Sequence, residues 1–221
     1  MRLLVLGGTG QTGKEVVDQA LKAGHSVTAF VRNPDKITTT HQNLEVVKGD
    51  VFNDKSLKPV LEGQDAVVSC LGFPRKPQPV TGYTSSASAI ITAMRESNVR
   101  RIVTMTSWFT DTNSGKDMGF MVNWMIIPFL RPVLTNMRQM ETFLETSASD
   151  INYTVVRPPQ LKNGPLTDRS MSVSEDFVVN AASSSIGTNR SDVAAFMLSC
   201  LNTTSYDSKM VAITTTPKKN A

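Results

Sequence analysis

The nine residues from Gly7 to Glu15, GGTGQTGKE, restrict the start of this chain more than any other stretch does. They follow the apolar run RLLVL, which is typical of a strand buried on both faces of a parallel sheet. They precede VVDQALK, whose apolar residues recur at helical spacing, and Gly24 marks a helix end soon after. A strand, a tight glycine turn and a helix are therefore predicted in succession.

Two phosphate-binding motifs overlap in this turn. Taken from Gly8, the residues spell G-x-x-x-x-G-K, close to the loop that holds nucleoside triphosphates, but Glu15 stands where that loop needs Ser or Thr to bind Mg²⁺. Taken from Gly7, they spell G-x-x-G-x-x-G, a variant of the dinucleotide motif, in which a pyrophosphate lies at the N-terminus of the helix. The dinucleotide interpretation is favoured, and a glycine turn without a ligand is the alternative.

Strand-like and helix-like segments alternate along the rest of the chain. The predicted strands cover residues 2–7, 25–32, 43–50, 65–72, 99–107, 152–158 and 209–214. The predicted helices cover residues 13–24, 54–63, 85–97, a long region that ends near Ser147, and 191–201. This order predicts an α/β fold, a Rossmann-type doubly wound parallel sheet. We expect a single domain over residues 1–221, with a substrate pocket built from its C-terminal half and a flexible tail at 215–221.

Composition narrows the class of partner. With a net charge of +4 and 19% charged residues, the chain is an ordinary, mildly basic globular protein, which suits an anionic small ligand. No run of Lys and Arg and no stripe of Arg with aromatic residues points to nucleic acid. Cys70 and Cys200 lie in apolar segments, as buried free thiols do, which predicts a reducing, cytoplasmic location. We expect a monomer.

The apolar segment from Phe120 to Met137 could be mistaken for a membrane span. It contains Pro128, Arg131 and Pro132, whereas a spanning helix needs about 20 mostly apolar residues without such breaks. We therefore expect no membrane span, and a helix that faces the core or covers the pocket. As a substrate wall it would present Trp124 and Met125 to a flat acceptor, and plain core packing is the alternative.

The end of the second predicted strand indicates which dinucleotide is bound. NAD sites usually have Asp or Glu there for the ribose hydroxyls, but this chain has VRNPDK, with Arg32 at that place and Lys36 one turn on. Two cations suit a 2′-phosphate, so the predicted cofactor is NADPH, and a solvated surface pair is the alternative. Asp50 and Val51 follow the third strand, where adenine should lie.

The usual proton donor of short-chain dehydrogenases is missing. Their Tyr-x-x-x-Lys pair keeps a phenol acidic, but the residues four after Tyr83, Tyr153 and Tyr206 are Ala, Arg and Met. No metal-ligand cluster can be built either. A redox step would then need an easily reduced acceptor, such as a flavin, a quinone or a conjugated tetrapyrrole.

Taken together, GGTGQTG, VRNPDK, GDV, LG, TSWF, VVRPPQ, NGPLT and FMLSCLNTTSYD resemble the NADPH-dependent flavin reductase or biliverdin-IXβ reductase family, which belongs to the atypical short-chain dehydrogenases near the NmrA-like group. The resemblance runs from about Arg2 to Asp207. It implies a Rossmann-type monomer that transfers hydride from NADPH to FMN, other flavins or linear tetrapyrroles.

The resemblance also implies roles for individual residues. Ser107, with Thr106 before it, would lie beside the nicotinamide, and Gln160 would border the substrate. Trp108 would contact the substrate. The remaining cofactor contacts implied are Gly7, Thr9, Gly10, Gln11, Thr12 and Gly13 at the pyrophosphate, Arg32 and Lys36 at the 2′-phosphate, Asp50 and Val51 at adenine, Leu71, Gly72 and Tyr83 along the ribose channel, and Pro158 and Pro159 at the nicotinamide.

Three departures from the relatives affect the expected substrate preference. Gln160 stands where they carry His, Met137 falls near their second pocket histidine, and Trp108 replaces a small residue. Two other functions stay open at this point. One is a non-catalytic NADP(H) sensor of the NmrA-like kind that acts through a protein partner, and the other is a reductase or isomerase with an unrelated substrate.

Overall fold

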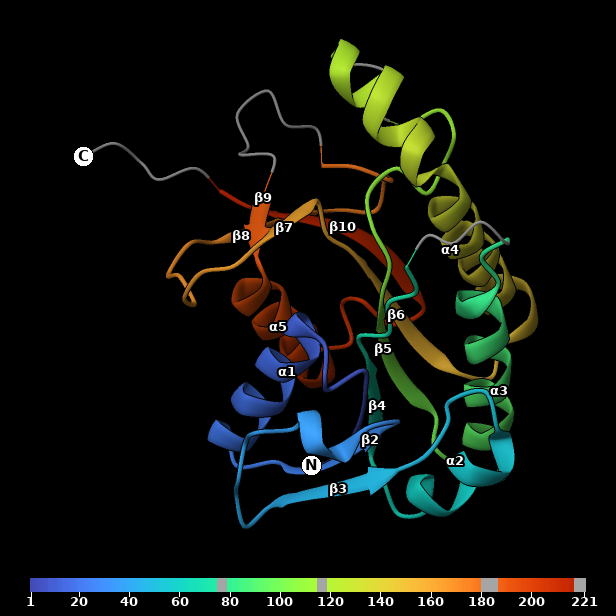
Figure 1. The fold of residues 1–221 in the computed structure, drawn as a ribbon, viewed down its shortest axis with the longest axis vertical. Coiled ribbons are helices and arrows are strands. Elements are labelled where there is room, and N and C mark those ends of the chain that lie inside the picture. The colour runs from blue at the N-terminus through green and yellow to red at the C-terminus, as the bar shows by residue number, and fades with distance from the viewer. Residues whose placement is uncertain (75–78, 115–118, 180–186, 217–221) are drawn as a thin grey trace.

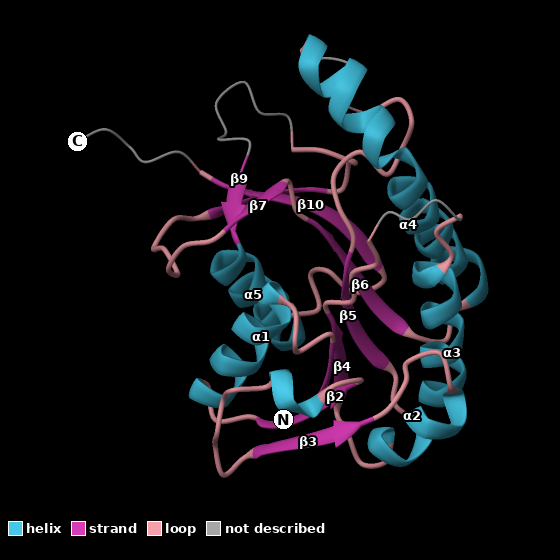
Figure 2. Ribbon diagram, in the orientation of Figure 1, coloured by secondary structure: helices cyan, strands magenta, loops and turns pink. Residues whose placement is uncertain are grey.

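The computed structural model describes residues 1–74, 79–114, 119–179 and 187–216. Within them, eight strands form one twisted sheet in the order β3-β2-β1-β4-β5-β6-β10-β8 (Figures 1 and 2). The strands are β1 (Arg2–Leu6), β2 (Ser26–Val31), β3 (Leu44–Lys48), β4 (Ala66–Ser69), β5 (Arg101–Met105), β6 (Asn152–Arg157), β8 (Met171–Ser174) and β10 (Lys209–Thr215). All neighbours are parallel except β10 and β8.

Helices cover both faces of this sheet, which confirms the predicted doubly wound α/β fold. Figure 1 shows α1 (Gln11–Lys22) and α5 (Arg190–Ser199) on one face, and α2 (Asp54–Leu61), α3 (Gly82–Glu96) and α4 (Ile127–Ser147) on the other. A small parallel pair, β7 (Gln160–Lys162) and β9 (Gly187–Asn189), stands apart from the main sheet.

Strand β1 shows why its sequence is apolar throughout. Leu3 and Val5 pack with the apolar face of α1, while Leu4 and Leu6 pack on the opposite side among residues of α2 and α3. All four are fully buried, because successive side chains of a strand point to opposite faces and both faces are covered. The four apolar residues predicted to form one face of α1 do so: Val16, Val17, Ala20 and Leu21.

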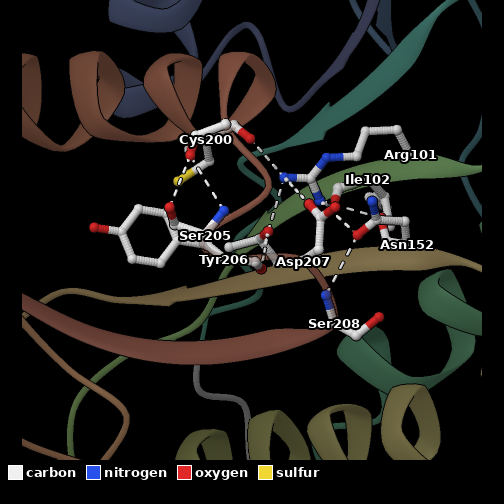
Figure 3. Close-up of polar contacts among 10 residues, drawn as sticks. Arg101, Ile102, Asn152, Cys200, Ser205, Tyr206, Asp207 and Ser208 are labelled. Carbon is white, nitrogen blue, oxygen red and sulfur yellow. Dashed lines mark hydrogen bonds and ion pairs between the residues drawn. The ribbon is translucent and has the colours of Figure 1, made fainter.

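Polar contacts of Arg101, which we call the clamp, lie at the N-terminal end of β5 and hold the turn before β10 (Figure 3). The guanidinium of Arg101 donates to the carbonyl oxygen of Cys200 at 2.7 Å and to Thr154 Oγ1 at 2.9 Å. It also lies 3.8 Å from the carboxylate of Asp207 in the turn before β10. The clamp lies at the N-terminal end of β5, whereas the loops that carry the candidate site residues follow the C-terminal ends of the strands.

Cys70 and Cys200 are both buried and free, as predicted.

The segment that begins at Phe120 departs from one of its two expected roles, that of a helix that faces the core. A π-helical turn at Val122–Ile126 leads into α4, and seven large apolar side chains there are exposed. We call them the exposed stripe: Phe120, Met121, Trp124, Met125, Ile126, Phe129 and Leu130. Trp124 is 70% exposed, and its ring stacks on that of Phe120. The expectation of core packing is correct for Ile127, Leu134 and Met137, which are buried together with Met140 further along α4.

Figure 1 shows the N-terminal half of α4 projecting beyond the body of the sheet. Among the described residues, no helix is long and apolar enough to cross a membrane. The predicted tail begins too early, since Thr215 is buried in β10 and the Thr216 amide donates to the Ser170 carbonyl. Residues 217–221 lie outside the described ranges.

Candidate functional site

The glycine turn between β1 and α1 is closely packed backbone. Gly7 has a φ of +79°, and a Cβ atom there would lie 2.7 Å from the carbonyl oxygen of Cys70. The Gly10 amide donates to the Gly7 carbonyl at 2.9 Å, and a Cβ atom on Gly13 would collide with that same carbonyl. The Cβ clashes at Gly7 and Gly13 explain why the turn needs glycine at these two positions.

Helix α1 begins directly after this turn with its first amides uncapped by any side chain. The N-terminus of a helix carries a partial positive charge and unpaired N–H groups, which together attract anionic oxygens. An open groove of about 340 Å³ lies at this point, lined in part by Gly7, Thr9, Gly10, Gln11 and Thr12. The groove lies where β1 separates β2 from β4, so the order of the strands reverses there, as at the ligand site of doubly wound sheets.

Nine of the predicted cofactor contacts line this groove. They are Gly7, Thr9, Gly10, Gln11, Thr12, Arg32, Val51, Leu71 and Gly72. Arg32 follows the last residue of β2 and is the cation that the sequence placed at this wall. The arrangement fits a nicotinamide dinucleotide, because a helix N-terminus, a close-packed glycine turn and a cation meet at one concave surface. The individual contacts stay predictions.

Other predicted contacts lie away from the groove. Gly13 lets the start of α1 lie against the carbonyl of Gly7. Asp50 Oδ1 accepts a hydrogen bond from the Phe52 amide at 3.1 Å within a local turn. Lys36 lines a neighbouring cleft with Thr9 and Lys14. Tyr83 is buried in α3, and its hydroxyl oxygen accepts the Phe73 amide at 3.2 Å. Burial raises the pKa of Tyr83, so its phenol is a poor acid here.

Sequence reasoning missed several groove residues. They are Phe30, Val31, Phe52, Cys70, Phe73, Leu161 and Arg190. The most consequential is Arg190, the first residue of α5, which brings a second cation into the groove and donates to Asn163 Oδ1 at 2.6 Å. No local motif marks it. The packing of α5 against α1 brings it there, and that contact spans most of the chain.

Ser107 lies just beyond the end of β5, where two backbone hydrogen bonds continue the pairing of this strand with β6. The Thr106 amide donates to the Val156 carbonyl, and the Trp108 amide donates to the Pro158 carbonyl, both at 2.9 Å. Ser107 is half-buried between these two bonds, and within the described ranges its hydroxyl has no hydrogen-bond partner. Pro158 and Pro159 are buried beside it, while Gln160 is exposed at the start of β7.

The three predicted substrate contacts are not gathered in one place. Trp108 is only 1% exposed and packs edge-on against Phe109, so in this structure it offers no surface to a substrate. This corrects the expectation for Trp108, which the resemblance had placed beside the acceptor. Trp124 and Met125 belong to the exposed stripe, and neither lines the groove.

Cys70 lies on the groove wall but is a weak candidate for a nucleophile. Burial raises the pKa of its thiol to about 12, so the thiolate is scarce at neutral pH. Within the described ranges, no group of His, Cys, Asp or Glu is arranged to hold a metal ion. The groove presents a helix N-terminus and two arginines, an arrangement that suits an anionic ligand.

Two sequence comparisons bear on the family. Residues 7–204 match a family described as NAD(P)H-binding. An uncharacterized chloroplastic protein of Arabidopsis thaliana is 30% identical over 187 residues, which make up 79% of this chain and 64% of that protein. The photosystem II assembly factor Ycf39 of Synechocystis is 39% identical over 69 residues, 31% of this chain and 21% of that protein. The chain thus spans less than two thirds of the length of these relatives.

Solved structures show the same fold at low identity. ChuY, an anaerobilin reductase of Escherichia coli O157:H7, superposes with a TM-score of 0.78 and 17% identity over all of both chains. A short-chain dehydrogenase/reductase of Veillonella parvula in complex with NADP gives a TM-score of 0.71 and 17% identity, covering 96% of this chain and 94% of that one. The predicted cofactor class is confirmed by the family match over most of the chain. This chain belongs to the NAD(P)H-binding family, with a Rossmann-type fold.

Proposed function

We propose that this protein is an NADPH-dependent reductase that transfers hydride to a flavin or a linear tetrapyrrole. The preference for NADPH over NADH is supported by Arg32 on the groove wall at the end of β2, where NAD sites carry an acid. A guanidinium binds phosphate oxygens in a planar, two-pronged geometry, which suits the 2′-phosphate of the cofactor.

The observation that carries the choice of acceptor is the setting of Ser107. Its hydroxyl has no side-chain partner in the described structure, and the sequence offers no Tyr-x-x-x-Lys pair to supply a proton. Reduction of an ordinary ketone needs such a donor, because the developing alkoxide must be protonated. Flavins and conjugated tetrapyrroles accept hydride into a delocalised system, and water can supply the proton afterwards. The structural likeness to an anaerobilin reductase is in keeping with this choice.

Bound NADPH would supply a hydride, which is equivalent to two electrons and one proton, and would leave as NADP⁺. The residues of this chain bind and orient. The turn at Gly7 and Gly10 and the first amides of α1 hold the diphosphate, while Arg32 holds the 2′-phosphate. The Ser107 hydroxyl donates a hydrogen bond that orients the nicotinamide or the acceptor, and Gln160 borders the acceptor.

Trp124 and Met125 complete this proposal as an apolar wall for a planar acceptor. Both side chains are more than half exposed, so they are available for contact. The segment that carries them follows the loop after β5, whose first residues include Ser107. A flat aromatic acceptor would bury part of the exposed stripe, which is favourable in proportion to the apolar area covered.

The test is anaerobic oxidation of NADPH by a panel of FMN, riboflavin, biliverdin isomers, quinones and simple ketones. We expect turnover with a flavin or a tetrapyrrole and none with the ketones. NADH in place of NADPH is the matched control for the cofactor, and we expect a much higher KM for it. Turnover confined to ketones would exclude the proposal, because it would require the proton donor that the chain lacks.

The exposed stripe favours one second function, an NADP(H) sensor that docks on a protein partner. Large apolar surfaces on a folded protein commonly mark interaction sites. Such a protein would bind NADPH with useful affinity but oxidise it with no member of the panel. Binding without turnover in the same experiment would therefore select the sensor over the reductase.

A further inference from the structure

A buried ion pair lies directly behind the proposed nicotinamide site. Glu141 of α4 is fully buried, and the side chain of Arg157, the last residue of β6, is 3% exposed. Arg157 Nε lies 2.9 Å from Glu141 Oε1 and Arg157 Nη2 lies 3.0 Å from Glu141 Oε2. The pair is thus bidentate, the strongest and most directional form of such a contact.

The same carboxylate also holds the loop that follows β5. Thr106 Oγ1 donates to Glu141 Oε1 at 2.8 Å, and Thr110 Oγ1 donates to Glu141 Oε2 at 3.1 Å. On the far side, the ring of Phe177 lies 4.3 Å from the guanidinium carbon of Arg157. One buried carboxylate therefore joins three parts of the chain: helix α4, the end of β6 and the loop after β5.

The joined segments are the ones that flank Ser107. Thr106 immediately precedes Ser107, and Arg157 immediately precedes Pro158. Their backbones are bonded on either side of Ser107, from Thr106 to Val156 and from Trp108 to Pro158. Glu141 therefore ties both segments, which these backbone bonds already join, to α4.

Stability alone does not account for burying these charges. Removing two ions from water costs several kcal/mol each, and well-packed apolar side chains of similar volume often stabilise a core as well or better. What an apolar pair lacks is direction, because only hydrogen bonds to a charged group fix both distance and angle. This points to a role in geometry.

We propose that Glu141 and Arg157 are positioning residues that set the place of Ser107 and Pro158 at the nicotinamide end of the cofactor. The inference rests on the proposed function, which places that end beside Ser107. Glu141 has no exposed atoms, so it acts only through the groups it holds, which are Thr106, Thr110, Arg157 and, at 3.5 Å, the half-buried Arg138 of its own helix. The adenine end, held by the glycine turn and Arg32, is independent of the pair.

The test separates the two ends of the cofactor. 2′,5′-ADP contains only the adenine end, whereas NADPH contains both, so the ratio of their dissociation constants measures the nicotinamide end without any need for turnover. In the full chain, Glu141→Gln keeps the shape of the side chain and removes its charge. We expect NADPH to bind about tenfold more weakly while 2′,5′-ADP changes less than about twofold, and turnover with FMN to fall about a hundredfold, as misplacement of a reacting group does.

The matched control is Asp150→Asn, which breaks the exposed pairs with Arg95 and Arg100 near the other end of α4. It removes these two ion pairs without touching the loops beside Ser107, so we expect both affinities to stay as in the wild type. Should Glu141→Gln fail to fold, Thr106→Val removes only one hydrogen bond to the carboxylate. The same selective loss, smaller in size, is expected from it.

A second variant distinguishes position from stability. Glu141→Leu combined with Arg157→Met replaces the pair with apolar side chains that leave no buried charge unpaired. We expect this double variant to regain thermal stability relative to Glu141→Gln and still to bind NADPH weakly. Recovery of the wild-type ratio of affinities would overturn the proposal, as would equal loss of NADPH and 2′,5′-ADP in Glu141→Gln. A wild type that binds both ligands but has no reductase activity would refute only the proposed function.

Discussion

The carbonyl oxygen of Gly7 fills the space that a Cβ atom on residue 13 would need. Gly13→Ala must therefore move either the turn or the start of α1. Alanine gains about 1 kcal/mol over glycine in a helix interior, but overpacking costs about 1–3 kcal/mol and backbone yields least easily. We expect a net loss of about 1–2 kcal/mol in the free energy of unfolding, measured with urea, and weaker dinucleotide binding.

Gly72→Ala is the control for that measurement. A Cβ atom at Gly72 meets nothing within 4 Å, although the residue lines the same groove. We expect its free energy of unfolding to stay within about 0.5 kcal/mol of the wild type. Equal destabilisation by the two substitutions would contradict the packing argument.

Arg32 should decide the choice between NADPH and NADH. A hydrogen bond from a charged donor to a phosphate contributes about 1.5–3 kcal/mol, which corresponds to at least about tenfold tighter binding of NADPH. Arg32→Ala should erase most of that preference, as measured by titration of both cofactors. Equal affinities in the wild type would refute the assignment.

Arg190 provides the contrast. It lines the groove from the start of α5, outside the region expected to meet the 2′-phosphate. Arg190→Ala should weaken NADPH and NADH alike, whereas Arg32→Ala should weaken NADPH alone. Lys36→Ala should change the preference less than Arg32→Ala, because Lys36 lies in the neighbouring cleft.

Ser107→Ala should slow FMN reduction about 3–30-fold and leave NADPH affinity within about threefold, since a hydroxyl that only orients contributes less than one that stabilises charge. Steady-state kinetics with FMN would measure this. Unchanged turnover would show that Ser107 only ends the strand and has no part in orienting the nicotinamide or the acceptor. A loss beyond about a thousandfold would show that it takes part in proton transfer.

Acid stability should depend in part on Asp150. Hydrogen bonds from Arg95 hold the pKa of the Asp150 carboxyl below its ordinary value of 3.8. A carboxyl with a lowered pKa in the folded state stabilises the protein fully above its unfolded pKa, and that stabilisation is lost as the pH falls through the folded value. Asp150→Asn should therefore flatten the loss of stability below about pH 4, followed by urea unfolding at several pH values. An unchanged pH profile would show that the pair contributes nothing.

Much of the fold followed from local pattern. Strand β1 could be predicted because it is apolar throughout, and α1 because its apolar residues share one face. Strands β7, β8 and β9 were not predicted, since each has only three or four residues and none is fully apolar. For the exposed stripe, the alternative of core packing was wrong for a physical reason, because an apolar segment does not by itself reveal whether anything in the chain covers it.

Residues of the groove could be predicted where a recognisable motif directly follows a strand. Gly7 and Gly10 follow β1 and Arg32 follows β2, and all three line the groove. Arg190 and the Glu141 pair depend on contacts between distant segments, which no short motif records. Trp108 was misplaced because a residue next to an expected site can point into the core.

The exposed stripe has a consequence for probes of folding. Dyes such as ANS fluoresce on accessible apolar surface, and their signal is usually taken as a mark of a molten globule. Here seven large apolar side chains lie on the surface of the folded chain. We therefore expect the native protein to give a dye signal of its own, so that a partly folded state would have to be recognised as a change from that baseline.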